Sequence, residues 1–456
     1  MAGYASEHVQ VGRNRRTRWG VLAGLLVLAA AAAALGPGLR RNSSDGANGD
    51  SIAQFLLAVA VILFVSHLLA TPLRRWHQPP VLGELLGGVL LGPSALGLLW
   101  PAGEDWLFHP DVLSNLDRAA QLGLVTFMFL LGCELRMDSV RNRRTVGAVV
   151  AGSMGLPFVV GVGIALAAGE MLGGPSANAL ASALFFGLAM SITALPVLAR
   201  ILVDLRLDGS PLGATALSAA AIGDGLAWTV LAVILATISP GANGRIATTT
   251  GLAVTLVLVT VLCVRPALAT LVRWMSQRHG HEHSLLAVLA VGAMGFAAFS
   301  TLIGLHAVIG AFLFGTAAPR RSAAVKQISE QLQGFAVAIL LPLFFAGVGL
   351  STSILLLGGD PVHWLLFAGV LLASIGTKFL GAGGAARLAG MPGDEALQLS
   401  TLMNCRGVTE LVVATVGLQY HLVSPLGFTI LVLVAMITTA GTAPLMRRWP
   451  SRITGP

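Results

Sequence analysis

The chain has 456 residues, of which 55% are hydrophobic and only 11% are charged. A soluble globular protein carries about 25% charged residues, so the composition and the mean hydropathy of +0.82 predict an integral membrane protein with many spans. The formal net charge of +8 indicates loop arginines that set orientation in a membrane, not nucleic-acid binding. A disordered, collagen-like or disulfide-framework protein is excluded.

Apolar segments of about 20 residues, bounded by glycine, proline and charge, follow one another along the chain. The stretch 284–318 is too long for one span, and we divide it at 300–304. The predicted transmembrane helices are 20–36, 52–71, 81–99, 116–134, 146–169, 179–203, 211–238, 248–272, 284–300, 301–318, 334–357, 363–385, 395–419 and 424–446.

The N-terminal extension, residues 1–51, has two interpretations. Its basic head, short Leu/Ala core and Ala-rich end are typical of a signal peptide as well as of a helix. A retained helix, which we favour, gives fourteen spans with both ends inside, whereas cleavage gives thirteen spans with the N-terminus outside. Residues 52–446 then form the transmembrane domain, and 447–456 form a short cytoplasmic tail.

Loops that are rich in lysine and arginine alternate along the chain with loops that are poor in them, which fits this span count. With a cytoplasmic N-terminus, the outside segments hold only Arg40, Arg41, Arg118 and Arg245 of the 28 basic residues. Positive charge concentrates in cytoplasmic loops. The sequence therefore predicts a multi-pass protein of the cell membrane with its C-terminus in the cytoplasm.

The span order indicates an internal repeat. Six spans cover 52–238, one span stands alone, and six more cover 284–446, so the two halves have opposite orientations. The fifth span of each half is interrupted, by 191–196 in the first half and by 404–407 in the second. Paired broken helices in inverted repeats point to a binding site at the midplane. We therefore predict an all-α protein of 13–14 helices, built as two inverted six-helix repeats with broken crossing helices.

Ionisable residues inside spans are costly and are functional candidates by default. Asp224 lies about halfway along 211–238 between small residues. A carboxylate there can bind a proton or a small cation, but scarcely both, and this competition is the simplest chemistry of exchange. Lys378, near the middle of 363–385, is the candidate counter-charge. It could be a fixed ion-pair partner or a proton carrier.

The remaining candidates lie at the interruptions and at one span end. Arg406 is expected to hold carbonyls of the broken helix or an acid such as Glu410. Ser191 and Thr193 offer oxygen ligands of the kind that hard cations prefer, although hydroxyls inside helices also bond back to their own backbone. Glu84 and Glu410 are candidate ion-entry or structural acids, and Glu84 could also be a helix-start residue.

No motif for an enzyme, a nucleotide or a cofactor is present. The sequence has no Walker loop, no zinc motif and no nucleophile elbow. The histidine-rich run 279–283 is interpreted as part of a solvated loop. We expect a transporter that is not an enzyme and that needs no cofactor or resident metal.

Four motifs, in order, resemble one family. They are 78–93 (QPPVLGELLGGVLLGP), 191–200 (SITALPVLAR), 219–224 (AAAIGD) and 402–411 (LMNCRGVTEL). These segments are similar to the signatures of the second branch of the monovalent cation/proton antiporter superfamily, especially its plant-type exchangers. The resemblance covers about 52–446.

The resemblance implies two inverted repeats that form a mobile core and a dimerisation domain, usually in a homodimer. It implies Asp224 as the ion- and proton-binding carboxylate and Lys378 as its basic partner. Gly223 stands where relatives commonly carry Asp, Asn or Gln, which leaves the ion and the coupling ratio open. The implied function is exchange of Na⁺ or K⁺ for protons. The alternatives are a channel-like potassium efflux protein and an exporter of an organic ion or ionophore complex.

Overall fold

The computed structural model describes residues 47–76, 78–134, 143–174, 178–207, 210–238, 251–252, 254–276, 282–303, 305–319 and 322–448. The predicted helix 20–36 and nearly all of the predicted tail lie outside these ranges, as does most of the histidine-rich run. Apart from one isolated bridge between Gly173 and Val423, the regular structure in the described ranges is helical.

The first six-span unit contains seven long or half-length helices. They are α2 (Ala47–Arg75), α3 (Pro80–Leu91), α6 (Pro110–Glu134), α7 (Arg143–Ala168), α8 (Ala179–Ser191), α9 (Leu195–Asp204) and α10 (Pro211–Ile238). The short helices α4 (Leu96–Leu99) and α5 (Pro101–Leu107) connect α3 to α6. The separate span consists of helical residues 254–259, a π-helical turn (Thr260–Val264) and α12 (Arg265–Ser276).

The second unit repeats this order. Its helices are α13 (Glu282–Leu302), α14 (Ala307–Ala317), α15 (Ala323–Phe335), α16 (Leu341–Leu350), α17 (Pro361–Lys378), α18 (Gly384–Leu388), α19 (Gly393–Met403), α20 (Val408–Gln419) and α21 (Pro425–Arg448). π-Helical turns join α15 to α16 and α17 to α18. Within the described ranges, 11 helical segments are long and apolar enough to cross a membrane, and α14 and α20 are shorter apolar helices. The predicted polytopic all-α class is confirmed.

Several helices begin or break at positions other than those predicted. The divided stretch 284–318 breaks after Leu302, within the predicted 300–304, but α14 starts only at Ala307, where the His306 side chain accepts the N–H of Val308. α15 starts at Ala323, well before the predicted 334, because the Ser322 hydroxyl caps it. Hydropathy detects only the apolar part of a helix, and α15 begins in polar sequence.

Two equivalent pairs of helices, each with one helix from either unit, cross at glycines. α3 packs on α16, and in the equivalent pair α14 packs on α6. A methyl group on Gly88 would collide with the backbone of Ala346, and one on Gly315 would collide with the backbone of Phe129. Small residues let helix backbones approach closely in membranes. The matching crossings support the inverted-repeat arrangement.

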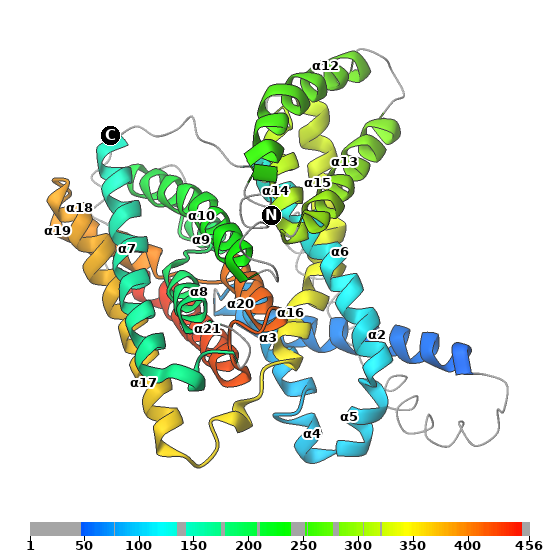
Figure 1. Ribbon diagram of the computed structural model, residues 1–456, viewed down its shortest axis with the longest axis vertical. Coiled ribbons are helices and arrows are strands. Elements are labelled where there is room, and N and C mark those ends of the chain that lie inside the picture. The colour runs from blue at the N-terminus through cyan, green and yellow to red at the C-terminus, as the bar shows by residue number, and fades with distance from the viewer. Residues whose placement is uncertain are drawn as a thin grey trace, which may run out of the picture.

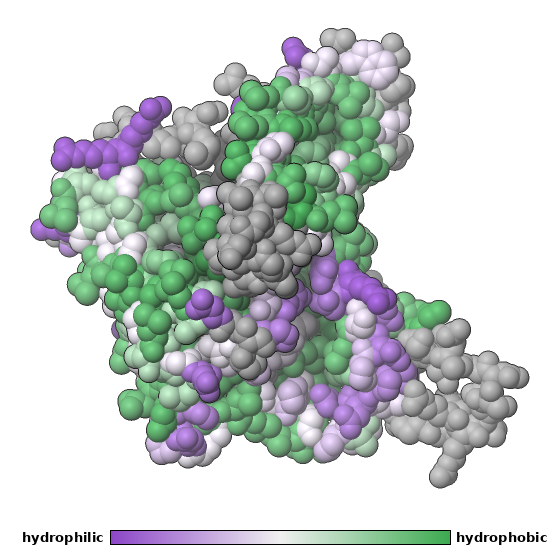
Figure 2. Space-filling model, in the orientation of Figure 1, coloured by the Kyte–Doolittle hydropathy of each residue, from purple (hydrophilic) through white to green (hydrophobic). Residues whose placement is uncertain are grey.

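The helices form two groups that are visible in Figure 1. The first group, which we call the core group, contains α7–α10 and α17–α21, and the second, which we call the scaffold group, contains α2–α6 and α12–α16. Apolar residues cover much of the face drawn in Figure 2, and hydrophilic residues gather in a few clusters. Large apolar side chains such as Leu365 and Val291 are more than 70% exposed, as expected of a surface that faces lipid.

Candidate functional site: a buried carboxylate between two broken helices

The two broken spans meet inside the core group. α8 ends at Ser191 and α9 begins at Leu195, because Pro196 lacks the N–H that would continue the helix. The second break separates α19 from α20, and its Cys405 carbonyl accepts the backbone N–H of Ala194 at 3.1 Å. Gly407 allows this approach, since a Cβ there would lie 2.6 Å from a methyl of Val197. The structure thus brings both sequence interruptions to one place.

Two buried cations bind the carbonyl end of α8. Arg406 donates to the carbonyls of Ala189 and Met190, at 3.2 and 2.6 Å. The ammonium of Lys378 donates to the carbonyl of Ser191 at 2.6 Å. The last carbonyls of a helix have no partner within the helix and carry partial negative charge. Arg406 and Lys378 supply both hydrogen-bond donors and opposite charge at this end.

Arg406 also forms an ion pair with Glu410, one turn further along the chain. The Nη1–Oε1 distance is 2.6 Å, and both side chains are 0% exposed. The Thr439 hydroxyl on α21 donates to the carbonyl of Arg406 and accepts the backbone N–H of Arg406, with an N···O distance of 3.0 Å. Both contacts that the sequence suggested for Arg406, with helix carbonyls and with Glu410, are therefore present. A charge pair this deep needs such additional hydrogen bonds to offset its desolvation.

Asp224 lies in the middle of α10 and is 1% exposed. The Thr409 hydroxyl donates to its Oδ2 at 3.5 Å. The backbone N–H of Leu195, at the start of α9, faces the carboxylate, and Oδ1 has no hydrogen-bond partner in the described part of the chain. The N-terminal ends of α9 and α20, which carry partial positive charge, therefore lie close to the carboxylate of Asp224.

Lys378 contacts the broken helix and not Asp224. Its ammonium lies 2.8 Å from the Thr193 hydroxyl oxygen, in addition to its bond with Ser191. The ion pairs among the described residues do not include Asp224 with Lys378. In this conformation Lys378 is a fixed donor to α8, and the carboxylate of Asp224 has no cationic partner in direct contact.

The two predicted hydroxyl ligands already have partners. The Thr193 hydroxyl donates to the carbonyl of Met403 at 2.8 Å while it accepts from Lys378. The Ser191 hydroxyl donates to the carbonyl of Leu188 at 2.7 Å, the back-bonding alternative that the sequence left open. Neither side chain contacts Asp224 among the described hydrogen bonds.

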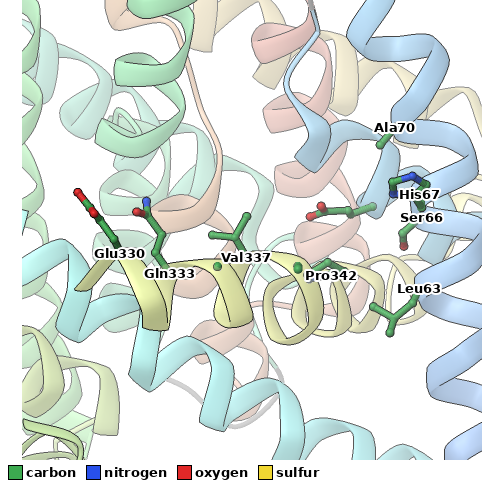
Figure 3. A pocket seen from close by; sticks show the side chains of 11 residues that line it. Leu63, Ser66, His67, Ala70, Glu330, Gln333, Val337 and Pro342 are labelled. Atoms are coloured by element: carbon green, nitrogen blue, oxygen red, sulfur yellow. The ribbon is translucent and has the colours of Figure 1, made fainter. Parts of the chain in front are cut away.

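Glu84 lies elsewhere, in the scaffold group. It is half-buried on α3 and lines a cavity of about 510 Å³ between α2, α3 and α15–α16. Figure 3 shows labelled lining residues from two sides of this cavity, His67 and Ser66 on one side and Glu330 and Gln333 on the other. The cavity lining does not include Asp224, Lys378 or Arg406, so the structure does not bring Glu84 into the central site.

Thr409 is the residue that the sequence analysis missed. It lies within the quoted motif 402–411, three residues after Arg406 and in the first turn of α20. A hydroxyl next to a helix interruption was recognised at Thr193 but not at Thr409. Within the described ranges, no group of three His, Cys, Asp or Glu side chains could hold a metal ion.

Comparison with known proteins places this fold in a family. Residues 56–448 match the family described as "Sodium/hydrogen exchanger, transmembrane". The chain belongs to the sodium/hydrogen exchanger family. This confirms the resemblance read from the four motifs, and it identifies a multi-pass membrane transporter, not an enzyme.

Individual exchangers are similar in sequence to this chain over most of its length. The chain is 35% identical to "Na(+)/H(+) antiporter NhaS4" of Synechocystis sp., over 87% of this chain and 97% of that protein. It is 33% identical to "Cation/H(+) antiporter 19" of Arabidopsis thaliana, over 90% of this chain but only 52% of that protein. The chain thus spans about half the length of the plant exchanger.

The fold is shared with a solved exchanger structure. The sodium proton antiporter MjNhaP1 from Methanocaldococcus jannaschii superimposes with a TM-score of 0.63 and 16% sequence identity, over 88% of this chain and 97% of that one. At this identity the likeness concerns the fold alone.

Proposed function

We propose that this chain is a secondary antiporter that exchanges a monovalent cation, Na⁺ or K⁺, for protons, with both competing for Asp224. One observation carries the proposal. Asp224 is a carboxylate that is 1% exposed at the crossing of two broken helices and has no ion-pair partner among the described residues. Such a group must gain a proton or a cation before it can cross an apolar barrier. The activities for which the similar exchangers are named support this chemistry.

The two helix groups suggest how the site changes sides. Asp224, Lys378 and Arg406 all belong to the core group, whereas the scaffold group contributes none of them. In the proposed cycle the core group moves as a body against the scaffold group, and Asp224 faces one side of the membrane at a time. A homodimer, a location in the cell membrane and a cytoplasmic C-terminus are part of this proposal.

The test is proton flux in proteoliposomes with Na⁺, K⁺, Li⁺ or no added cation. Asp224→Asn removes the titratable group with little change in volume, so we expect cation-driven proton flux to fall to the level of empty liposomes. The variant should remain folded, because Asp224 has no charged partner that the change would leave unpaired. Asp204→Asn is the matched control, since its partner Arg200 lies at the surface and such pairs contribute little. Normal flux in Asp224→Asn would refute the competition mechanism.

A further inference from the structure

The hydroxyl that contacts Asp224 comes from the second repeat. Thr409 is 0% exposed, and its Oγ1 lies 3.5 Å from Asp224 Oδ2. The hydroxyls of Ser191 and Thr193, which the sequence favoured as ligands, are bonded to backbone carbonyls instead. Among the described residues, the side-chain oxygen with a hydrogen bond to Asp224 is therefore that of Thr409.

The distance between these two oxygens is informative. A hydroxyl bonded to a carboxylate normally approaches to about 2.5–2.7 Å, so 3.5 Å is long for a hydrogen bond alone. Calcium, which is close to sodium in ionic radius, binds oxygen at about 2.3–2.6 Å, and neighbouring ligands at right angles are then about 3.3–3.7 Å apart. The observed separation falls within that range. Potassium has longer bonds to oxygen, so at the same right angle its two ligand oxygens would lie further apart.

We propose that Thr409 Oγ1 and Asp224 Oδ2 are adjacent ligands of the transported cation and that their spacing favours Na⁺ over K⁺. This inference rests on the proposed exchange function and names its ion. A hydroxyl has one donor and two acceptor lone pairs. Thr409 therefore serves both states of the cycle: it offers a lone pair to the cation, and it accepts the O–H of Asp224 when the carboxyl is protonated.

Three variants separate a ligand from a packing residue. Thr409→Val keeps the shape but removes the oxygen, and Thr409→Ser keeps the oxygen. Thr442→Val is the matched control, because Thr442 is 2% exposed and its hydroxyl bonds only to the carbonyl of Thr438 within α21. In proteoliposomes we expect wild type to have a lower apparent KM for Na⁺ than for K⁺. Thr409→Val should raise the Na⁺ KM about tenfold with little loss of maximal rate, a change of about 1.4 kcal/mol.

The same variant should raise the K⁺ KM much less, Thr409→Ser should restore the Na⁺ KM, and Thr442→Val should leave it unchanged. A lower wild-type KM for K⁺ than for Na⁺ would overturn the assignment of the ion. Equal effects of Thr409→Val and Thr409→Ser, or an unchanged Na⁺ KM in Thr409→Val, would overturn the assignment of the ligand.

A binding measurement distinguishes failure of this inference from failure of the proposed function. The unfolding temperature of the detergent-purified protein is measured in NaCl, KCl and choline chloride, because a ligand that binds only the folded state raises it. We expect a rise specific to Na⁺ in wild type and Thr409→Ser, and its loss in Thr409→Val. Absence of that rise in wild type would refute the site itself. A Na⁺-specific rise without any cation-driven proton flux would refute antiport and leave the Thr409 site supported.

Discussion

At the scale of single residues, the two buried acids near the crossing have opposite environments. Glu410 is tied to Arg406 at 2.6 Å, whereas Asp224 has a long contact with a neutral hydroxyl. Both lie fully inside the protein, and depth alone does not separate them. We therefore expect a structural role for Glu410, and we expect Asp224 to be the acid that binds a proton or a cation.

Glu410→Gln is expected to destabilise the fold. It would leave the guanidinium of Arg406 buried without an opposite charge, which typically costs about 3–5 kcal/mol. The measurement is thermal unfolding in detergent, where the midpoint should fall well below that of Asp224→Asn. Glu395→Gln is the control, since Glu395 is exposed on α19. A Glu410→Gln variant that melts like wild type would contradict the structural role.

At the scale of helices, close crossings position the broken spans. Gly152 on α7 and Gly381 in the π-helical turn after α17 face each other so closely that a Cβ on either would collide with the backbone of the other. These helices are equivalent members of the two units, and α17 carries Lys378 to the break in α8. The close packing that glycine allows at these crossings thus helps to set the positions of the charged side chains.

Gly88→Ala tests a close crossing in the scaffold group. The added methyl would meet the backbone of Ala346 on α16, and overpacking of this kind costs about 1–3 kcal/mol or prevents folding. The expected result is a lower unfolding midpoint and a poorer yield of folded protein. Gly347→Ala on α16 is the matched control, because a Cβ there has nothing within 4 Å. Equal midpoints for the two variants would show that the α3–α16 crossing tolerates a side chain.

At the scale of the whole molecule, the charges inside the core group decide how transport responds to voltage. Arg406 and Glu410 neutralise each other, and the Lys378 side chain donates to Ser191 and Thr193. A Lys378 that stays protonated throughout the cycle adds a constant charge. Asp224 is then the group in the crossing that exchanges a bound proton for a bound cation. A proton and a monovalent cation give the site the same net charge.

We therefore expect electroneutral exchange of one proton for one cation. In proteoliposomes with the potential clamped by valinomycin and Na⁺ as the test cation, the rate should not depend on the imposed voltage. A clear voltage dependence that disappears in Lys378→Gln, with exchange retained, would show instead that Lys378 releases a second proton. An unchanged voltage dependence in that variant would place the moving charge elsewhere.

The local sequence pattern by itself determined the spans, the helix breaks and the buried charges of this protein. Apolar length identified spans from 52 onwards, because every backbone polar group in lipid must be satisfied within a helix. The helix interruptions at 191–196 and 404–407 could be predicted because proline and glycine change the backbone conformation at their own positions. The buried charges Asp224, Lys378, Arg406 and Glu410 were visible because ionisable residues are rare in apolar sequence.

Only the tertiary structure decided which partner each charge has. Opposite signs suggested that Asp224 and Lys378 would pair, but the second unit packs so that Lys378 reaches the carbonyl end of α8 and Thr409 reaches Asp224. Glu84 appeared in the same sequence argument yet lines a cavity in the scaffold group. Contacts between residues that lie about 185 positions apart in the sequence depend on how the two helix units pack. The periodicity of the sequence carries no information on that packing.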